Sequence, residues 1–437
     1  MGQLLSHPIE EKQLDYKTHA KLSYSVGAMQ GYRMSMEDAH NVRINEDETI
    51  AVFGVFDGHG GKQCAEYLAE HLPKYIFRQL IRKRSKSRNR SHNYDYTHSH
   101  KHQHLHQHQH QHQQQHNNSN SNSQQRAQLL NGEVLRLLKH SFFKTDHELS
   151  NYDNFINCGS TGTILVIIDN KLYVANTGDS RCIISTSAGA AKSLSYDQKP
   201  NIMGERVRIE NSNGYIVNGR INEILALSRA FGDFKFKIPY LTATNNNYII
   251  DNIKRQVEER DKERSNKKAQ QQQQQQQQEE EEEGRNDPQP QGSSTSSSLS
   301  KHKVQKDRQS LGSHEYIHIP PESFQVTVEP DILIFDMNEQ PTPEFIVMAC
   351  DGIWDCFKND QLVKLIRDKL VLGWKLNKIV EYILNDSLTM ANNYTGIGFD
   401  NMTLIIIALH LDGRVAENID EWYAHMIEKI EKEKGLR

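Results

Sequence analysis

The sequence predicts an α+β fold with an antiparallel core, and two patterns along the chain carry this prediction. Short apolar runs rich in Val, Ile and Phe, such as residues 50–56 and 345–349, have the length and the flanking Gly or Asp residues of buried strands. These runs are joined largely as hairpins, while helix-like runs come in separate pairs, which disfavours a doubly wound parallel sheet. No dinucleotide fingerprint or P-loop follows any of the runs, so kinases, NTPases and dehydrogenases are not leading candidates.

Hydrophobic periodicity predicts the individual elements. Residues 158–168 and 172–184 are expected to form the two strands of a hairpin, because Asp169 and Asn170 between them are typical turn residues. Apolar residues at helical spacing predict helices at 64–76, 134–149, 205–209, 362–370, 379–384 and 419–434. The first of these helices is expected to pack on the sheet.

Two long segments differ in composition from the rest of the chain. Residues 82–126 are basic at first and then dominated by His, Gln, Asn and Ser, and residues 245–313 contain Gln, Glu and Ser runs. Neither segment can bury enough apolar surface to offset its ordering entropy, so both are predicted to be disordered insertions. The alternating His and Gln residues offer ligands for transition metals, but repeat expansion is the favoured interpretation. The remainder predicts one domain, residues 23–412, after an N-terminal segment, residues 1–22, and before a C-terminal helix, residues 413–437.

The overall composition favours an intracellular protein that does not bind nucleic acid. The formal net charge of −4 over 437 residues is unlike that of a chain built to neutralise phosphate backbones. Five cysteines without a CxxC pair fit a reducing compartment, and neither a secretory signal nor a membrane-spanning run is found. We therefore expect a cytoplasmic protein. The basic run at residues 83–90 leaves nuclear import or an anionic-lipid patch open, although a solvated linker is favoured.

The start of the chain fits the pattern for N-myristoylation. Removal of Met1 would expose Gly2, and Ser6 stands at the required position. The pattern is short and permissive, so a chance match remains the alternative. One acyl chain gives only reversible membrane contact, to which the basic run at residues 83–90 would add a second signal.

Three of the apolar runs carry an acidic residue at one end, namely Asp57, Asp351 and Asp400. Strand ends are rigid mounts for side chains, so the three residues are expected to form a carboxylate cluster. Carboxylates that pack together resist ionisation unless a cation holds them, and hard oxygen ligands suit Mg²⁺ or Mn²⁺. The sequence therefore predicts a metal site.

A second group of candidate residues precedes the run at residues 50–56. Arg33, Glu37 and Asp38 lie close together in the sequence. An arginine can bind a phosphate through two parallel hydrogen bonds, and carboxylates can reach a metal or its water ligands.

Eight short motifs follow one another along the chain: residues 29–40, 56–61, 158–161, 175–181, 225–233, 328–331, 349–355 and 400–403. In this order they resemble the metal-dependent protein serine/threonine phosphatases of the protein phosphatase 2C (PP2C) type. A single motif of this length would be weak support, whereas eight in the same order are hard to produce by chance. Residues 1–8 also resemble the N-terminus of fungal members.

The resemblance implies a central β-sandwich of two antiparallel sheets flanked by helices, with a binuclear Mg²⁺ or Mn²⁺ centre at one end of the sandwich. It also implies roles for residues at matching positions. Asp57 would bridge both metals, the Gly58 carbonyl would bind one, Asp351 and Asp400 would bind the other, and Glu37 and Asp38 would act through water. Arg33 would bind phosphate, His59 would be the general acid, and Asp179 with Asp351 and Asp355 would form a weaker third metal site. The expected partners are phosphorylated proteins, and the expected state is a monomer.

The chain departs from the family pattern at one place. Many members have Asp-His-Lys-Pro where this chain has Asp197, Gln198, Lys199 and Pro200. The change removes an ionisable group but no predicted metal ligand, so it bears on substrate preference rather than on activity. Two other hypotheses stay open: a catalytically silent relative that only binds phosphoproteins, and a scaffold or metal-binding protein that acts through its insertions. A metal-dependent nuclease is disfavoured by the charge.

Overall fold

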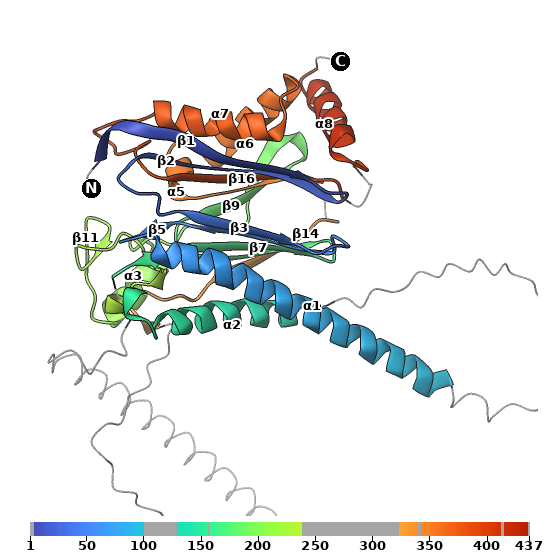
Figure 1. The fold of residues 1–437 in the computed structure, drawn as a ribbon, viewed down its shortest axis with the longest axis horizontal. Helices are drawn as coiled ribbons and strands as arrows, with labels where there is room; N and C mark the ends of the chain where they lie inside the picture. The colour runs from blue at the N-terminus through green and yellow to red at the C-terminus, as the bar shows by residue number, and fades with distance from the viewer. Residues whose placement is uncertain are drawn as a thin grey trace, which may run out of the picture. The chain divides into compact units, whose positions relative to one another are not determined.

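Two antiparallel sheets stack face to face in the computed structural model of the chain, with helices on both outer faces (Figure 1). The structure describes residues 4–99, 129–155, 157–237, 323–338, 342–411 and 415–435. All of them belong to the unit formed by Met1–Lys237 and Pro321–Arg437. The second unit, Ile238–Pro320, lies outside the described residues.

The larger sheet contains six strands. Their order is β1 (Leu4–Thr18), β2 (Leu22–Arg33), β16 (Met402–Leu409), β15 (Pro343–Ala349), β9 (Arg181–Thr186) and β10 (Ala190–Ser193). Every neighbouring pair is antiparallel. The first strand therefore pairs along its length with the second, and Leu4 lies opposite Arg33.

The smaller of the two stacked sheets contains five strands. Their order is β14 (Asp331–Asp336), β8 (Lys171–Thr177), β7 (Gly162–Ile168), β4 (Ile50–Phe56) and β3 (Ala39–Ile44). One apolar core fills the space between the sheets, with Phe53 and Leu165 from this sheet and Ile346 and Ile405 from the other. This core explains why the central strands are apolar throughout, since each of them is covered on both faces.

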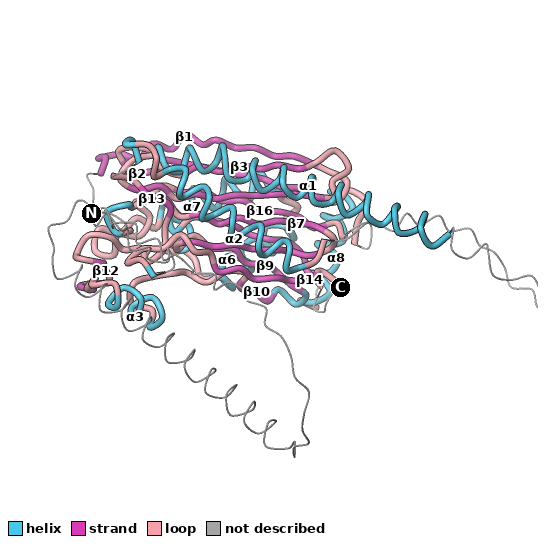
Figure 2. The backbone as a smooth tube through the Cα atoms, turned by 90° about the horizontal axis from the view of Figure 1, so that it is seen from below, coloured by secondary structure: helices cyan, strands magenta, loops and turns pink. Residues whose placement is uncertain are grey.

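Helices α6 (Asn359–Val371), α7 (Leu376–Thr389) and α8 (Ile419–Glu433) pack against the six-stranded sheet through a second apolar core. Helices α1 (Gln63–Ser99) and α2 (Asn131–Leu149) lie on the outer face of the five-stranded sheet (Figure 1). Figure 2 shows α3 (Met203–Asn211) and β12 (Arg220–Ile221) at one end of the sandwich and α8 at the other.

Short elements complete the end of the sandwich that holds α3. A small sheet joins β13 (Phe231–Gly232), β6 (Gly159–Ser160) and β5 (Gly58–His59), and β11 (Ile216–Val217) pairs with β12. Helix α5 (Asp351–Trp354) begins two residues after the end of β15.

The predicted fold class is confirmed, and so are most of the predicted elements. The runs at residues 50–56 and 345–349 are strands β4 and β15, and the turn at Asp169 and Asn170 joins β7 to β8. Both turn residues have positive φ, as a two-residue hairpin loop of this kind requires. Each predicted helix is present, with boundaries that differ by a few residues at most sites.

The prediction of one strand over residues 172–184 is wrong. The segment forms β8 in the five-stranded sheet and β9 in the six-stranded sheet, so the chain crosses between the sheets in the bend at residues 178–180. Gly178 has a φ of 108°, a conformation that favours glycine. Both halves of the segment are apolar, so hydrophobic periodicity does not reveal the change of sheet.

Two boundaries also differ from the sequence prediction. Helix α1 continues to Ser99, so the start of the first predicted insertion is helical, and Arg84 within it donates a hydrogen bond of 2.9 Å to Asp169. At the N-terminus, most of the segment at residues 1–22 is strand β1, so this segment is part of the larger sheet. The remainder of the first insertion, residues 100–126, and all of residues 245–313 lie outside the described residues.

Within the described part of the chain, no helix is both long and apolar enough to span a bilayer. All five cysteines are free, and four of them are buried.

Helix α8 is anchored to α7 by a tyrosine hydroxyl. Tyr423 is 5% exposed, and its Oη accepts a hydrogen bond of 2.8 Å from the backbone N–H of Leu376. We expect Tyr423→Phe to lower the free energy of unfolding by about 1–2 kcal/mol, because it leaves this buried N–H without its acceptor. Denaturant unfolding measures the change. Tyr394→Phe is the matched control, since Tyr394 is 98% exposed. Equal stability of the two variants would contradict this assignment.

Candidate active site

The acidic residues predicted from the sequence gather at one end of the sandwich, where strand ends from both sheets meet. Asp38 directly precedes β3, and Asp57 directly follows β4, in the five-stranded sheet. Asp351 lies two residues after the end of β15 of the six-stranded sheet, and Asp400 lies two residues before β16. Asp179 lies in the bend that joins the two sheets. Carboxylate oxygens of Asp57, Asp179 and Asp351 lie within 4.8 Å of one another.

The backbone around Asp57 is fixed by the neighbouring strand. Its N–H donates a hydrogen bond of 3.0 Å to the Thr161 hydroxyl, and its carbonyl accepts one of 2.9 Å from the Thr161 N–H. The Thr161 hydroxyl also lies 2.8 Å from that of Ser180, next to Asp179. Thr161 therefore links two acidic residues that are far apart in the sequence, a role that the sequence did not reveal.

Arg33 forms an ion pair with Asp400. Its Nη2 atom donates a hydrogen bond of 2.6 Å to Asp400 Oδ2, and the arginine and aspartate side chains are 42% and 33% exposed. Burial alone lowers the pKa of Arg33, but the charge and hydrogen bond of Asp400 and the charges of Asp351 and Asp57 raise it overall. The guanidinium therefore stays charged beside the acidic cluster.

Asn401 holds the loop that carries Glu37 against β16. Its side-chain amide donates to the carbonyls of Gln30 and Ser35 at 2.9 and 3.1 Å, and its Oδ1 accepts from the Glu37 N–H at 2.8 Å. The Glu37 carboxylate in turn accepts hydrogen bonds from the Ser35 hydroxyl and the Gly61 N–H. Asn401 belongs to a motif recognised in the sequence, but nothing in the sequence showed that it ties these distant segments together.

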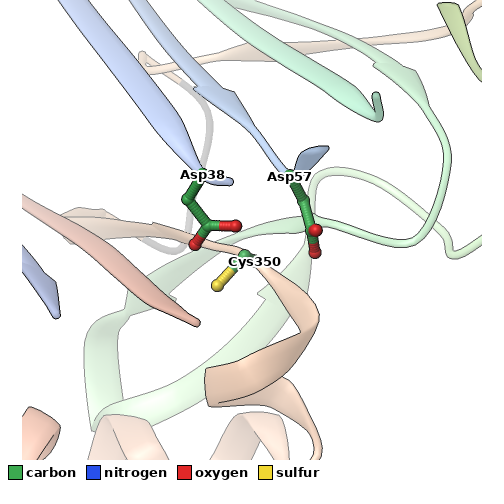
Figure 3. Close-up of side chains that lie close together, drawn as sticks. All are labelled: Asp38, Asp57 and Cys350. Atoms are coloured by element: carbon green, nitrogen blue, oxygen red, sulfur yellow. The ribbon is translucent and has the colours of Figure 1, made fainter. Parts of the chain in front are cut away.

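Figure 3 shows the side chains of Asp38 and Asp57 extending from neighbouring strands toward Cys350. Asp38 accepts a hydrogen bond of 2.8 Å from the Thr403 hydroxyl. The Cys350 sulfur accepts one of 3.1 Å from the Thr403 N–H and donates to the Asn401 carbonyl. Burial and the nearby carboxylates raise the pKa of the Cys350 thiol well above its usual value, so this cysteine stays protonated. Its role is to hydrogen-bond the backbone of Asn401 and Thr403.

The carboxylates strongly perturb one another. Burial and then the charges of the other acids raise the pKa of Asp57 and of Asp351 well above the usual range. The pKa of Asp38 is raised to about 7, mainly by burial, although hydrogen bonds from Thr403 and Cys350 oppose the shift. The cluster therefore carries more negative charge than the neighbouring Arg33 and Lys199 side chains offset. Its donors are carboxylate oxygens, so the residues present fit hard divalent cations such as Mg²⁺ and Mn²⁺.

His59 is paired with an aspartate that was not among the predicted site residues. Its Nε2 lies 2.7 Å from Asp233 Oδ2, and the side chains are 29% and 8% exposed. Burial alone lowers the pKa of His59, but the charge and hydrogen bond of Asp233, with Asp179, raise it overall. A Cβ atom at position 159 would overlap both Asp233 Oδ2 and His59 Nε2, so the pair requires Gly159 beneath it.

The structure thus brings together the predicted residues at one end of the sandwich, and Gly58 lies beside them in β5. Asp355 is exposed and lies directly after α5. Gly2 lies outside the described residues.

Comparisons with known proteins agree with this fold. Residues 22–123 and 76–395 match the family model described as protein phosphatase 2C. Protein phosphatase 2C homolog 4 of Saccharomyces cerevisiae is 33% identical, with 100% of both chains covered. Protein phosphatase 2C homolog 3 of Schizosaccharomyces pombe is 28% identical, covering 100% of this chain and 75% of the relative.

Solved structures show the same architecture. The crystal structure of serine-threonine phosphatase 2C from Toxoplasma gondii has a TM-score of 0.54 at 14% identity, covering 91% of this chain and 99% of that one. At this identity the likeness bears on the fold alone. The family model matches most of the sequence, and the Saccharomyces cerevisiae relative matches all of it, so these two comparisons show the family. This chain therefore belongs to the protein phosphatase 2C family of protein serine/threonine phosphatases.

Proposed function

We propose that this phosphatase hydrolyses phosphoserine and phosphothreonine in proteins with the help of two divalent cations, Mg²⁺ or Mn²⁺. The observation that carries the proposal is the cluster of carboxylates at the end of the sandwich, where burial and the charges of the neighbouring acids raise the pKa of Asp57 and of Asp351. Such a cluster is costly to a fold unless ions hold it. Arg33 and His59 beside it are groups suited to phosphate chemistry.

The residues that would hold the two ions are those at the positions that match the family's motifs. Asp57 would bind both ions, the Gly58 carbonyl one of them, and Asp351 and Asp400 the other, while Glu37 and Asp38 would act through water. When bound, the two ions supply Lewis-acid chemistry that lowers the pKa of water, so that water can attack phosphorus in line at neutral pH.

Arg33 would bind the substrate phosphate. Its contact with Asp400 occupies Nη2 and orients the planar guanidinium, and its side chain is 42% exposed, so a phosphate can reach it. A guanidinium carries five N–H donors, which suits the equatorial oxygens of a transferring phosphoryl group.

His59 would protonate the departing serine or threonine oxygen. Asp233 holds the imidazole and raises its pKa, so the ring carries the proton that a general acid must donate. Asp233 is a positioning residue in this scheme, because it acts through His59.

The remaining parts of the proposal concern location and assembly. We propose a monomer in the cytoplasm, with nuclear import through the basic run at residues 83–90 as the alternative to a solvated linker. Myristoylation of Gly2 would add reversible membrane contact. A mass spectrum of the chain expressed in a eukaryotic host tests the acylation.

The activity is tested by hydrolysis of a phosphothreonine peptide with Mn²⁺, with Mg²⁺ and with EDTA. We expect turnover with a divalent cation, no turnover in EDTA, and loss of turnover in Asp351→Asn. Folded protein that binds phosphopeptide without turnover under every metal condition would instead support the catalytically silent alternative.

A further inference from the structure

A lysine side chain lies against the acidic cluster on the side of Asp179. The Lys199 ammonium is 3.3 Å from Asp179 Oδ2, and the side chains are 45% and 8% exposed. Burial alone lowers the pKa of Lys199, but Asp179, Asp351 and Asp355 raise it overall. Lys199 in turn opposes the effect of burial on the pKa of Asp179 and of Asp355. One ammonium therefore serves several carboxylates.

The backbone next to Lys199 is fixed to the bend that carries Asp179. Gln198 is 3% exposed; its N–H donates to the Gly178 carbonyl at 3.0 Å, and its Oε1 accepts from the Gly178 N–H at 2.8 Å. Its amide also donates to the Asn176 carbonyl and to Asp331. The glutamine that replaces the family's histidine thus clamps this segment onto the residue just before Asp179.

The residue before the clamp is fixed as well. Asp197 accepts two hydrogen bonds from Arg181, from Nε at 2.8 Å and from Nη2 at 2.6 Å. The Arg181 guanidinium also stacks over Trp354, 5.0 Å from its ring. Because residues 197 and 198 are both fixed, the backbone of Lys199 is held within reach of Asp179.

We propose that the Lys199 ammonium is a built-in counter-cation for Asp179 and its neighbours, so that a third divalent ion binds there only by displacing it. The inference rests on the proposed function, because it concerns an ion beyond the two that the site would hold for hydrolysis. Two cations cannot share the same carboxylates without repulsion, so Lys199 keeps the third site weak. The third ion would bind only when its concentration is high.

The test is a Mn²⁺ titration of the full chain after EDTA has been removed, followed by calorimetry and by the electron paramagnetic resonance of free Mn²⁺. We expect Lys199→Met to tighten the weakest class of sites about tenfold, a modest factor because water screens a half-exposed ammonium. Lys199→Arg keeps the charge and should behave as the wild type. Lys364→Met is the matched control, since it removes another lysine from an ion pair with an aspartate, on α6.

The outcomes separate this inference from the proposed function. Adding Asp179→Asn to Lys199→Met should abolish the weak class and leave the tight class of sites. In a second outcome, the chain binds Mn²⁺ at its tight sites while Lys199→Met leaves the affinity of the weak class unchanged or lowers it. That result would overturn the role of Lys199 but not the proposed function. A wild-type chain that binds no Mn²⁺ tightly would overturn the metal centre of the proposed function.

Discussion

Replacing Asp57 with asparagine is expected to reduce phosphopeptide turnover by about 10³-fold or more while leaving the fold intact. Asp57 lies at the centre of the cluster, grouped with Asp179 and Asp351 on one side and with Asp38 on the other. Its backbone is held by Thr161 and does not depend on the carboxylate. The substitution therefore removes a central negative charge without opening a cavity.

The same substitution is expected to stabilise the metal-free protein. Burial and the other acids raise the pKa of Asp57 in the folded state. The contribution of Asp57 to the free energy of unfolding is therefore fully present below the usual aspartate pKa of about 4, and it is lost as pH rises through the folded pKa. In EDTA at neutral pH, Asp57→Asn should thus have a higher Tm than the wild type, and the difference should vanish near pH 4. Thermal unfolding in EDTA across pH measures both effects.

Addition of Mn²⁺ gives the complementary readout. The wild type should gain Tm with Mn²⁺ at neutral pH, and Asp57→Asn should gain much less, because ligand binding stabilises only the state that binds. Asp420→Asn is the control, since the Asp420 side chain is 83% exposed at the start of α8. An Asp57→Asn variant with normal turnover would refute its assignment as the bridging ligand.

Replacing Asp233 with asparagine is expected to lower kcat on a phosphothreonine peptide by about 10²-fold with little change in KM. Asp233 lies 2.7 Å from the imidazole of His59 and keeps its pKa raised against the effect of burial. Without that charge, less of the imidazole is protonated at neutral pH, so less general acid is available.

The leaving group distinguishes this role from a merely structural one. An aryl phosphate whose leaving group is stable as an anion needs little protonation, so its turnover should change far less in Asp233→Asn than that of the peptide. His59→Gln should show the same selectivity, and adding Asp233→Asn to it should cost nothing more, since the two residues act as a unit. An equal loss on both substrates would show that Asp233 only supports the fold.

The carboxylate cluster could be predicted because each of its main residues stands next to an apolar run. Asp57, Asp351 and Asp400 lie one or two residues from β4, β15 and β16, so the strand pattern located them without knowledge of how the sheets stack. The pattern does not say which strand ends meet, and that information came only from the resemblance to a family. The roles of these residues stay predictions until the variants are measured.

Other parts were not predictable from local pattern. Strand β1 is largely exposed and rich in polar residues, so its sequence lacks the apolar pattern of a strand. It is a strand because it pairs with β2. Asp233 and His59 are 174 residues apart, and only the short sheet of β5, β6 and β13 brings them together. Helix α1 extends into a segment that composition alone assigned to an insertion.

The bend at residues 178–180 and the acidic residues at the strand ends together place carboxylates from both sheets at one point. Ions bound there would join Asp57 to Asp351, which are far apart in the chain, and would stabilise the folded state, because only that state brings these carboxylates together. Without ions, the charges of the same carboxylates repel one another at that end. Metal loading would therefore act as a reversible cross-link, and amide hydrogens in β4 and β15 should exchange with solvent more slowly in Mn²⁺ than in EDTA.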